Sequence, residues 1–155
     1  MANNVLIATQ TKASFTLTLA SLANAAARQS TLLTNTTPGY PAAIVLLKIE
    51  SGASAPTAGS VYEIYLLRAD ETPTLSDDAA GATDAAITIE NSPLLGTIVT
   101  TATTNKNFYG VFDTSVLGPL GPKWGIAVKN STGQSLNGTE SNHGYEYIYY
   151  NNQVQ

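Results

Sequence analysis

The sequence predicts an all-β protein, a jelly-roll-like two-sheet sandwich of about eight strands. Two observations favour this class. Short segments rich in Val, Ile, Tyr and Thr recur along the chain, and Gly, Pro, Asn and Ser separate them at regular spacing. A chain of 155 residues buries most of the surface that its unfolded form exposes, so a single domain needs no disulfide or metal for stability.

The first clear strand is SFTLTLA, residues 14–20, in which Phe and Leu alternate with Ser and Thr. Strict alternation predicts a strand with one buried face. Residues 1–13 precede it, and we interpret them as an extended N-terminal arm, which leaves residues 14–155 as the β-sandwich domain. The following segment, SLANAAARQS, also fits a turn or two of helix, because it is rich in Ala and its apolar residues have helical spacing.

Two longer strands follow in the middle of the chain. AAIVLLKIE (residues 42–50) is almost continuously apolar, which is typical of a central strand covered on both faces. SVYEIYLLRA (residues 60–69) is rich in Val, Ile and Tyr and is also expected to be a strand. Residues 70–85 are acidic and without periodicity, so we expect a surface loop there.

The remaining strands are short and separated by turns. Asn91-Ser92-Pro93 predicts a turn between two of them. Further Gly-Pro pairs and a Gly/Asn-rich loop divide the others. The expected strands are AITIE (86–90), LLGTIVTT (94–101), NFYGVFDT (107–114), KWGIAVKN (123–130) and YEYIYY (145–150).

Composition excludes several classes of partner. The net charge is −4 and the seven Lys and Arg residues are scattered singly, so the chain lacks the cationic stripe that nucleic acid requires. No apolar run approaches the length of a membrane helix, and MANNVLIATQTK lacks the basic region of a secretory signal. We therefore expect no nucleic-acid partner and no membrane association.

The surface is expected to carry little charge. Charged residues make up 12% of the chain, against about 25% in an average soluble domain. A surface of Thr, Ser, Asn and Ala costs less to desolvate than a charged one. An ordinary stable β-domain and a subunit packed against others both fit this composition.

Catalytic residue types are almost absent. The chain has no cysteine and one histidine, His143, in a Gly/Asn-rich loop. It has no nucleophile elbow and no phosphate loop. We predict that the protein is not an enzyme and has no catalytic, metal-binding or cofactor-binding residues.

Two weaker possibilities involve carboxylates. The acidic loop could offer oxygen ligands to calcium, although its charges are better explained by solvation. The carboxylates concerned are those of Asp70, Glu71, Asp77, Asp78 and Asp84. Glu63 and Glu146 could serve a glycosidase if they faced one cleft about 5–9.5 Å apart.

The C-terminal strand carries four of the eight tyrosines. In a strand, Tyr145, Tyr147 and Tyr149 point to one face, and Glu146, Ile148 and Tyr150 to the other. Tyrosine offers a large contact area at low entropic cost and tolerates a wet rim. The stripe therefore fits a subunit interface, a sugar-stacking platform or the core of its own domain.

The order of these segments resembles a known group of proteins. The strand followed by LASLANAAARQSTLLTN, then GSVYEIYLLRADE, GPKWGIAVKNSTGQSL and a Tyr-rich last strand is similar to the head decoration, or cement, proteins of tailed bacteriophages. The resemblance covers nearly the whole chain and consists of strand and turn patterns.

The resemblance implies a structural virion protein with no cofactor. Such a protein is made in the cytoplasm of the bacterial host and lies on the outer surface of the capsid. It is usually a homotrimer and stabilises the shell by bridging neighbouring major capsid proteins. Its arms reach to neighbours, which makes Val5, Leu6, Ile7, Tyr145, Tyr147 and Tyr149 the candidate subunit or capsid interface.

One alternative function remains open at the level of sequence. A carbohydrate- or receptor-binding β-sandwich module of a phage fibre or adhesin would share the fold. It would use exposed tyrosines and Trp124 to stack on sugars. The position of these rings separates the two functions.

Overall fold

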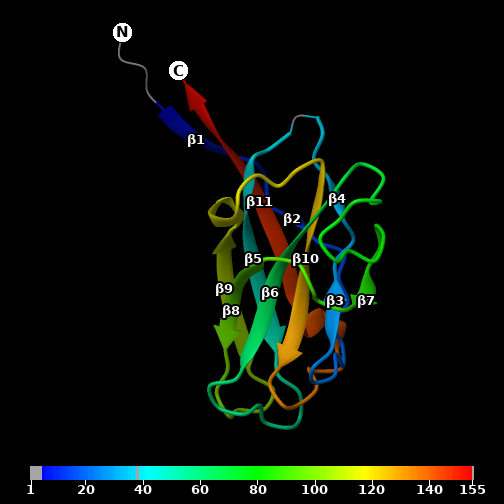
Figure 1. Ribbon diagram of the computed structural model, residues 1–155. Coiled ribbons are helices and arrows are strands. Elements are labelled where there is room, and N and C mark those ends of the chain that lie inside the picture. The colour runs from blue at the N-terminus through cyan, green and yellow to red at the C-terminus, as the bar shows by residue number, and fades with distance from the viewer. Residues whose placement is uncertain (1–4, 38, 155) are drawn as a thin grey trace.

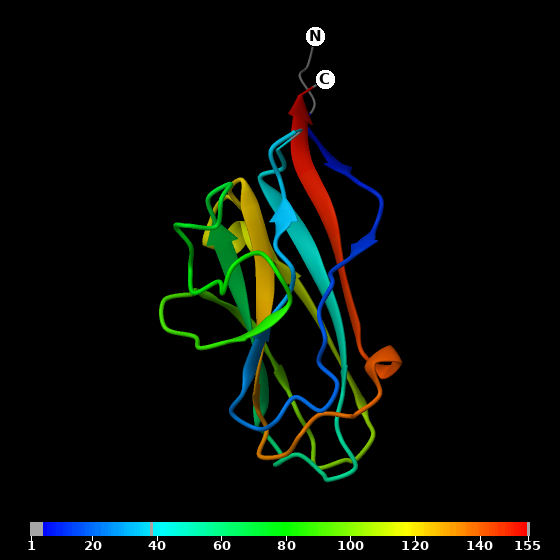
Figure 2. The same cartoon turned by 90° about the vertical axis from the view of Figure 1, so that its right-hand side faces the viewer.

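The computed structural model describes residues 5–37 and 39–154, with the side chains of residues 7–37 and 39–151. Two antiparallel sheets pack face to face (Figures 1 and 2), which confirms the predicted all-β sandwich. Short 3₁₀ turns at Thr114–Leu117 (η1) and Glu140–Asn142 (η2) are the helical elements of the described residues. None of the helices in this part of the chain is long and apolar enough to cross a membrane.

The chain alternates between the two sheets. Sheet A has the order β1 (Val5–Thr9), β11 (Gly144–Val154), β5 (Ala42–Glu50) and β9 (Asn107–Asp113), with β2 (Ala13–Ser14) also paired to β11. Sheet B has the order β7 (Ala85–Ile87), β3 (Ala27–Gln29), β10 (Lys123–Ser131), β6 (Val61–Ala69) and β8 (Leu94–Val99), with β4 (Leu33–Thr34) also paired to β10.

The core lies between the sheets and centres on Trp124. The fully buried indole meets Phe15 edge-on, with ring centroids 5.4 Å apart. It also donates a hydrogen bond of 2.8 Å from Nε1 to the hydroxyl of Tyr149. Inward-facing side chains of both sheets complete the cluster, including Val45, Leu47, Ile49, Tyr62, Ile64, Leu66, Ile126 and Val128.

The helix considered for SLANAAARQS does not form. Ser21 and Ala25 have positive φ angles of 58° and 64°, which interrupt any helix. Their backbone N–H groups bond instead to the carbonyls of Asn137 and Asn130. These long-range hydrogen bonds outweigh the helix propensity of the alanines. The segment therefore follows the rim of the sandwich and then continues into β3.

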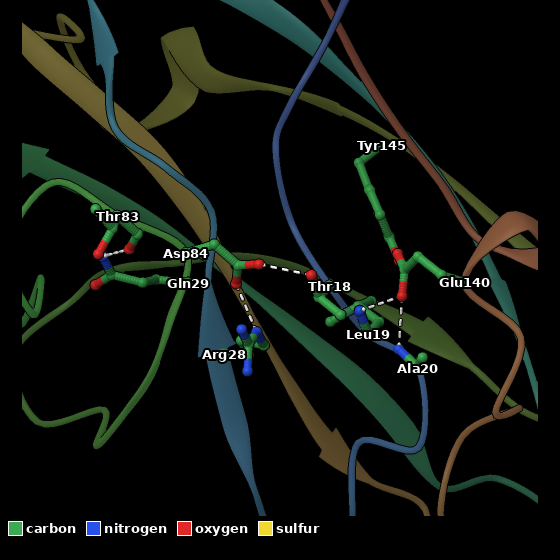
Figure 3. A network of polar contacts seen from close by, with 9 residues as sticks. All are labelled: Thr18, Leu19, Ala20, Arg28, Gln29, Thr83, Asp84, Glu140 and Tyr145. Atoms are coloured by element: carbon green, nitrogen blue, oxygen red, sulfur yellow. Dashed lines mark hydrogen bonds and ion pairs between the residues drawn. The ribbon is translucent and has the colours of Figure 1, made fainter.

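A half-buried carboxylate, that of Glu140, holds this segment to the C-terminal part of the chain. Glu140 accepts backbone N–H bonds from Leu19 (2.9 Å) and Ala20 (2.8 Å), and a bond of 2.5 Å from the hydroxyl of Tyr145 (Figure 3). Burial and the neighbouring Glu140 raise the pKa of Tyr145. The Glu140 carboxylate therefore links Leu19 and Ala20, which lie at least 120 positions earlier in the chain, to Tyr145 at the start of β11.

The aromatic ring of Phe112 packs between β8 of sheet B and β9 of sheet A. A Cβ atom at Gly96 of β8 would lie 2.5 Å from Cε1 of Phe112, and a Cβ at Gly110 of β9 would lie 2.5 Å from Cε2 of the same ring. The ring thus occupies the space that both glycines leave. Contact between β8 and β9 depends on this arrangement.

Gly96→Ala should lower the free energy of unfolding by roughly 1–3 kcal/mol, because the new methyl group overlaps the Phe112 ring. The loss of unfolding free energy caused by Gly96→Ala should be smaller in a chain that also carries Phe112→Leu. Urea unfolding followed by the fluorescence of Trp124 measures both. Gly144→Ala is the matched control, since its Cβ would make only an ordinary contact of 3.6 Å with Lys48. Equal losses from the two alanine substitutions would contradict this account.

Candidate interaction surface

Part of the outer face of sheet B, over β6 and β10, is covered by the chain itself. The segment of residues 70–92 lies over this face (Figure 2) and forms a second apolar cluster with it. Leu67, Ala69 and Ala127 point outward from β6 and β10, yet each is at most 7% exposed. Ala79, Ile87 and Ile89 of the covering segment pack on them. The part of this sheet face around Leu67, Ala69 and Ala127 is therefore not available to a partner, whereas Thr97 and Val99 of β8 remain exposed.

Polar contacts hold the covering segment in place. Gln29 donates from Nε2 to the carbonyl of Thr83 (2.6 Å) and accepts the backbone N–H of Ala80 (2.7 Å). Asp84 accepts from Nε of Arg28 (2.5 Å) and from the hydroxyl of Thr18 (2.7 Å), as Figure 3 shows. Side chains of β3 and its neighbours thus anchor the far part of the acidic loop.

Asp78 holds residues 90–92, the C-terminal end of the covering segment, by hydrogen bonds. Its carboxylate accepts the backbone N–H groups of Glu90, Asn91 and Ser92 and the Ser92 hydroxyl, at 2.7–3.0 Å. Burial by itself raises the pKa of this carboxyl, but the hydrogen bonds from Ser92 and from the backbone outweigh burial and lower the pKa to about 2. The ionised form is the one that holds the loop.

Asp78→Asn should lower the free energy of unfolding at pH 7 by roughly 1–2 kcal/mol, a value discounted for partial exposure. In the native protein this contribution is present above about pH 4, the pKa of an unfolded Asp, and is lost as the pH falls toward 2. The variant should lack that pH dependence in urea unfolding. Glu71→Gln, at an exposed carboxyl of the same loop, is the control and should leave stability at pH 7 unchanged. Parallel pH curves for Asp78→Asn and the native chain would refute the assignment.

The outer face of sheet A differs, because no described residue lies over it. In β11, β5 and β9, directly paired residues point to the same side. Three cross-strand rows result: Gly144–Lys48–Tyr109, Glu146–Leu46–Val111 and Ile148–Ile44–Asp113. The middle of this face is therefore apolar, with one charged residue in each row.

Several of these apolar side chains are largely exposed. Tyr109 is 69% and Val111 is 68% exposed. Tyr150 and Ile7 (68% exposed) continue the surface along β11 and β1, beside the loop that holds Pro119. We call the set Ile44, Leu46, Tyr109, Val111, Ile148 and Tyr150 the sheet A patch. Tyr109 and Val111 are exposed and the other four are half-buried, and we take this apolar surface as the candidate interaction surface.

The tyrosine stripe lies on the opposite side of β11 from the patch. Tyr145 is buried (7% exposed), and Tyr147 and Tyr149 pack against the core. The three rings thus point inward and pack within this chain, and the expectation that they contact another chain stays a prediction. Alternation along the strand instead places Ile148 and Tyr150 outward.

The N-terminal segment is extended but not free. Its residues 5–9 form β1, which pairs with β11 from Tyr150 to Val154. Pairing between β5 and β11 ends at Tyr150, so the two terminal strands project from the body as a ribbon (Figures 1 and 2). Ile7 lies on this ribbon and is exposed. Residues 1–4 and the side chains of Val5 and Leu6 lie outside the described part.

His143 is buried and contacts backbone groups of the fold through both ring nitrogens. It is 7% exposed, and its Nδ1 accepts the backbone N–H of Glu50 (3.2 Å). Its Nε2 lies 3.1 Å from the carbonyl of Asn137. The neutral tautomer with the proton on Nε2 satisfies both contacts. Neither ring nitrogen is left to act on a substrate.

The two candidate glycosidase carboxylates lie on opposite outer faces. Glu63 points outward from β6 in sheet B, and Glu146 points outward from β11 in sheet A, where it pairs with Lys12 at 2.7 Å. Burial raises the pKa of Glu63, but hydrogen bonds from Ser131 and Tyr65 lower it overall. No single cleft can hold both groups, as glycoside hydrolysis requires.

The rings expected to stack on sugars are also inside. Trp124 is fully buried, and the tyrosine stripe surrounds it. A carbohydrate-binding module could therefore not use Trp124, whereas Tyr109 of sheet A is 69% exposed. In the residues that the structure describes, no three His, Asp or Glu side chains gather as a metal site. Asp77, Asp78 and Asp84 are engaged with Arg68, the backbone and Arg28.

Comparison of the chain with protein-family models, with curated proteins and with solved structures finds no match in any of the three. The sheet A patch is also a surface that sequence reasoning missed. Its signal is present in Ile44 and Leu46 of the segment 42–50, which the sequence predicts to be a central strand covered on both faces.

Proposed function

We propose that this chain is a structural protein of a bacteriophage particle that binds the outer surface of the capsid and bridges neighbouring major capsid proteins. The observation that carries the proposal is the sheet A patch. One face of the sandwich has its own covering segment, whereas the other presents apolar side chains to solvent. The sequence resemblance to decoration proteins supplies the biological setting.

The chemistry of the patch suits adhesion to a protein. Exposed Tyr, Val, Leu and Ile side chains gain free energy when a partner removes them from water. Each row carries one charged residue, Lys48, Glu146 or Asp113, and apolar side chains lie between them. Lys12 and Glu146 at its border neutralise each other. These properties support binding without a reaction.

Stabilisation of the shell then follows from mass action. A ligand that binds only the assembled capsid stabilises that state by an amount that grows with its concentration. If copies are joined as the homotrimer that the resemblance implies, linked weak contacts raise avidity by about 10²–10⁴. Weak binding at each patch is then sufficient for tight binding of the whole oligomer to the capsid.

Val111→Asp should abolish binding to expanded capsids of the phage from which the chain derives, because it places a charge beside Leu46 in the patch. Co-sedimentation of purified chain with capsids measures occupancy. The isolated chain should keep its stability within about 0.5 kcal/mol, as surface substitutions usually do.

Thr97→Asp is the matched control, since Thr97 is exposed on the outer face of β8 in sheet B. It should leave occupancy unchanged. Saturation of capsids by the Val111→Asp chain, or absence of native binding at any concentration, would overturn the proposal.

A further inference from the structure

A hollow of about 460 Å³ opens at one corner of the sheet A patch. It exists because Gly144 stands in an outward-facing position of β11 and has no side chain to fill it. A Cβ atom there would touch only the stem of Lys48, at 3.6 and 3.8 Å. Leu46, Tyr109 and Val111 contribute apolar walls, and Lys48 and Glu146 contribute the charged groups.

Of the two charged side chains that line the hollow, Glu146 has an ion-pair partner and Lys48 has none. Glu146 is already paired with Lys12 at 2.7 Å, and both nitrogens of His143 contact backbone groups. Among the described residues, Lys48 is the one cationic side chain with neither an ion pair nor a hydrogen bond. The other six Lys and Arg residues each have a polar partner. An unpaired ammonium group thus stands beside an apolar hollow.

We propose that this hollow receives an acidic peptide segment of the protein partner. An aliphatic or aromatic side chain of the segment enters the space above Gly144, and an adjacent carboxylate pairs with Lys48. This inference rests on the proposed function and specifies the chemistry of the partner surface that meets the patch.

The composition of the hollow favours this ligand over others. A phosphate group would need several convergent donors, whereas one free ammonium matches one carboxylate. A sugar would need polar groups around its hydroxyls, but Leu46, Val111 and the glycine backbone are apolar or lack side chains. An apolar side chain next to an acidic residue satisfies both features of the site.

The test uses short peptides as probes of the full chain. The peptide Ac-Ser-Phe-Glu-Ser-NH2 is titrated into the ¹⁵N-labelled protein and compared with Ac-Ser-Phe-Lys-Ser-NH2. The acidic peptide should shift the backbone amide signals of Tyr109, Gly110 and Gly144 saturably. The lysine peptide should bind at least about fivefold more weakly, because it brings a like charge to Lys48. Absence of saturation, or equal affinity for the two peptides, would overturn the proposal.

Two variants separate the apolar and charged parts of the site. Gly144→Val fills the hollow without a backbone clash and should remove the binding of the acidic peptide. Lys48→Glu should weaken the acidic peptide and strengthen the lysine peptide. Lys106→Glu, an exposed charge reversal that contacts Thr101 elsewhere, is the control. Thermal unfolding confirms that each variant is folded. Unchanged affinity in Gly144→Val would place the ligand elsewhere and refute the inference.

The outcome is independent of the capsid experiment. Peptide titration needs no viral shell, so the proposed function and this inference can fail separately. If Val111→Asp abolishes capsid binding but the peptides never saturate, the partner meets the patch without using the hollow. If the peptides bind as expected and capsids do not, the site is real and its partner is another protein.

Discussion

The aromatic cluster around Trp124 fixes which side of the last strand is buried. Its indole donates to the Tyr149 hydroxyl and packs against Phe15 and Tyr147. Because side chains alternate in a strand, a shift of one residue in β11 would exchange its two faces. The inward tyrosines therefore determine that Ile148 and Tyr150 meet solvent. The interaction surface is a consequence of how the core is packed.

The two outer faces of the sandwich differ in how their apolar side chains are covered. Over sheet B, the acidic segment buries Leu67 and Ala127, and its charges are used by Arg28 and by backbone N–H groups. This cover depends on buried polar anchors such as Gln29 rather than on apolar area alone. Sheet A has no such cover among the described residues, so its outward-facing apolar side chains are less buried than Leu67 and Ala127.

Much of the fold could be predicted from the sequence, because alternation and turn residues are local signals. The strands of residues 42–50, 60–69 and 123–130 match β5, β6 and β10 closely. The strand predicted for residues 14–20 is wrong beyond Ser14, where β2 ends, although Phe15, Leu17 and Leu19 are buried as the alternation predicts. The direction of the tyrosine stripe could not be predicted, since it depends on a tryptophan 25 positions away. The path of residues 19–29 could not either, because carbonyls of Asn130 and Asn137 override its helical spacing.

The segment 42–50 carries the strongest argument for a partner. A strand that is apolar on both sides is typical of a sheet covered on both faces. In this chain Val45, Leu47 and Ile49 face the core, while Ile44 and Leu46 stay half-exposed on the opposite side. A solvated face of an antiparallel sheet normally alternates to polar residues. Apolar residues persist here on the open side, so the sequence of β5 suits a state in which a second surface covers it.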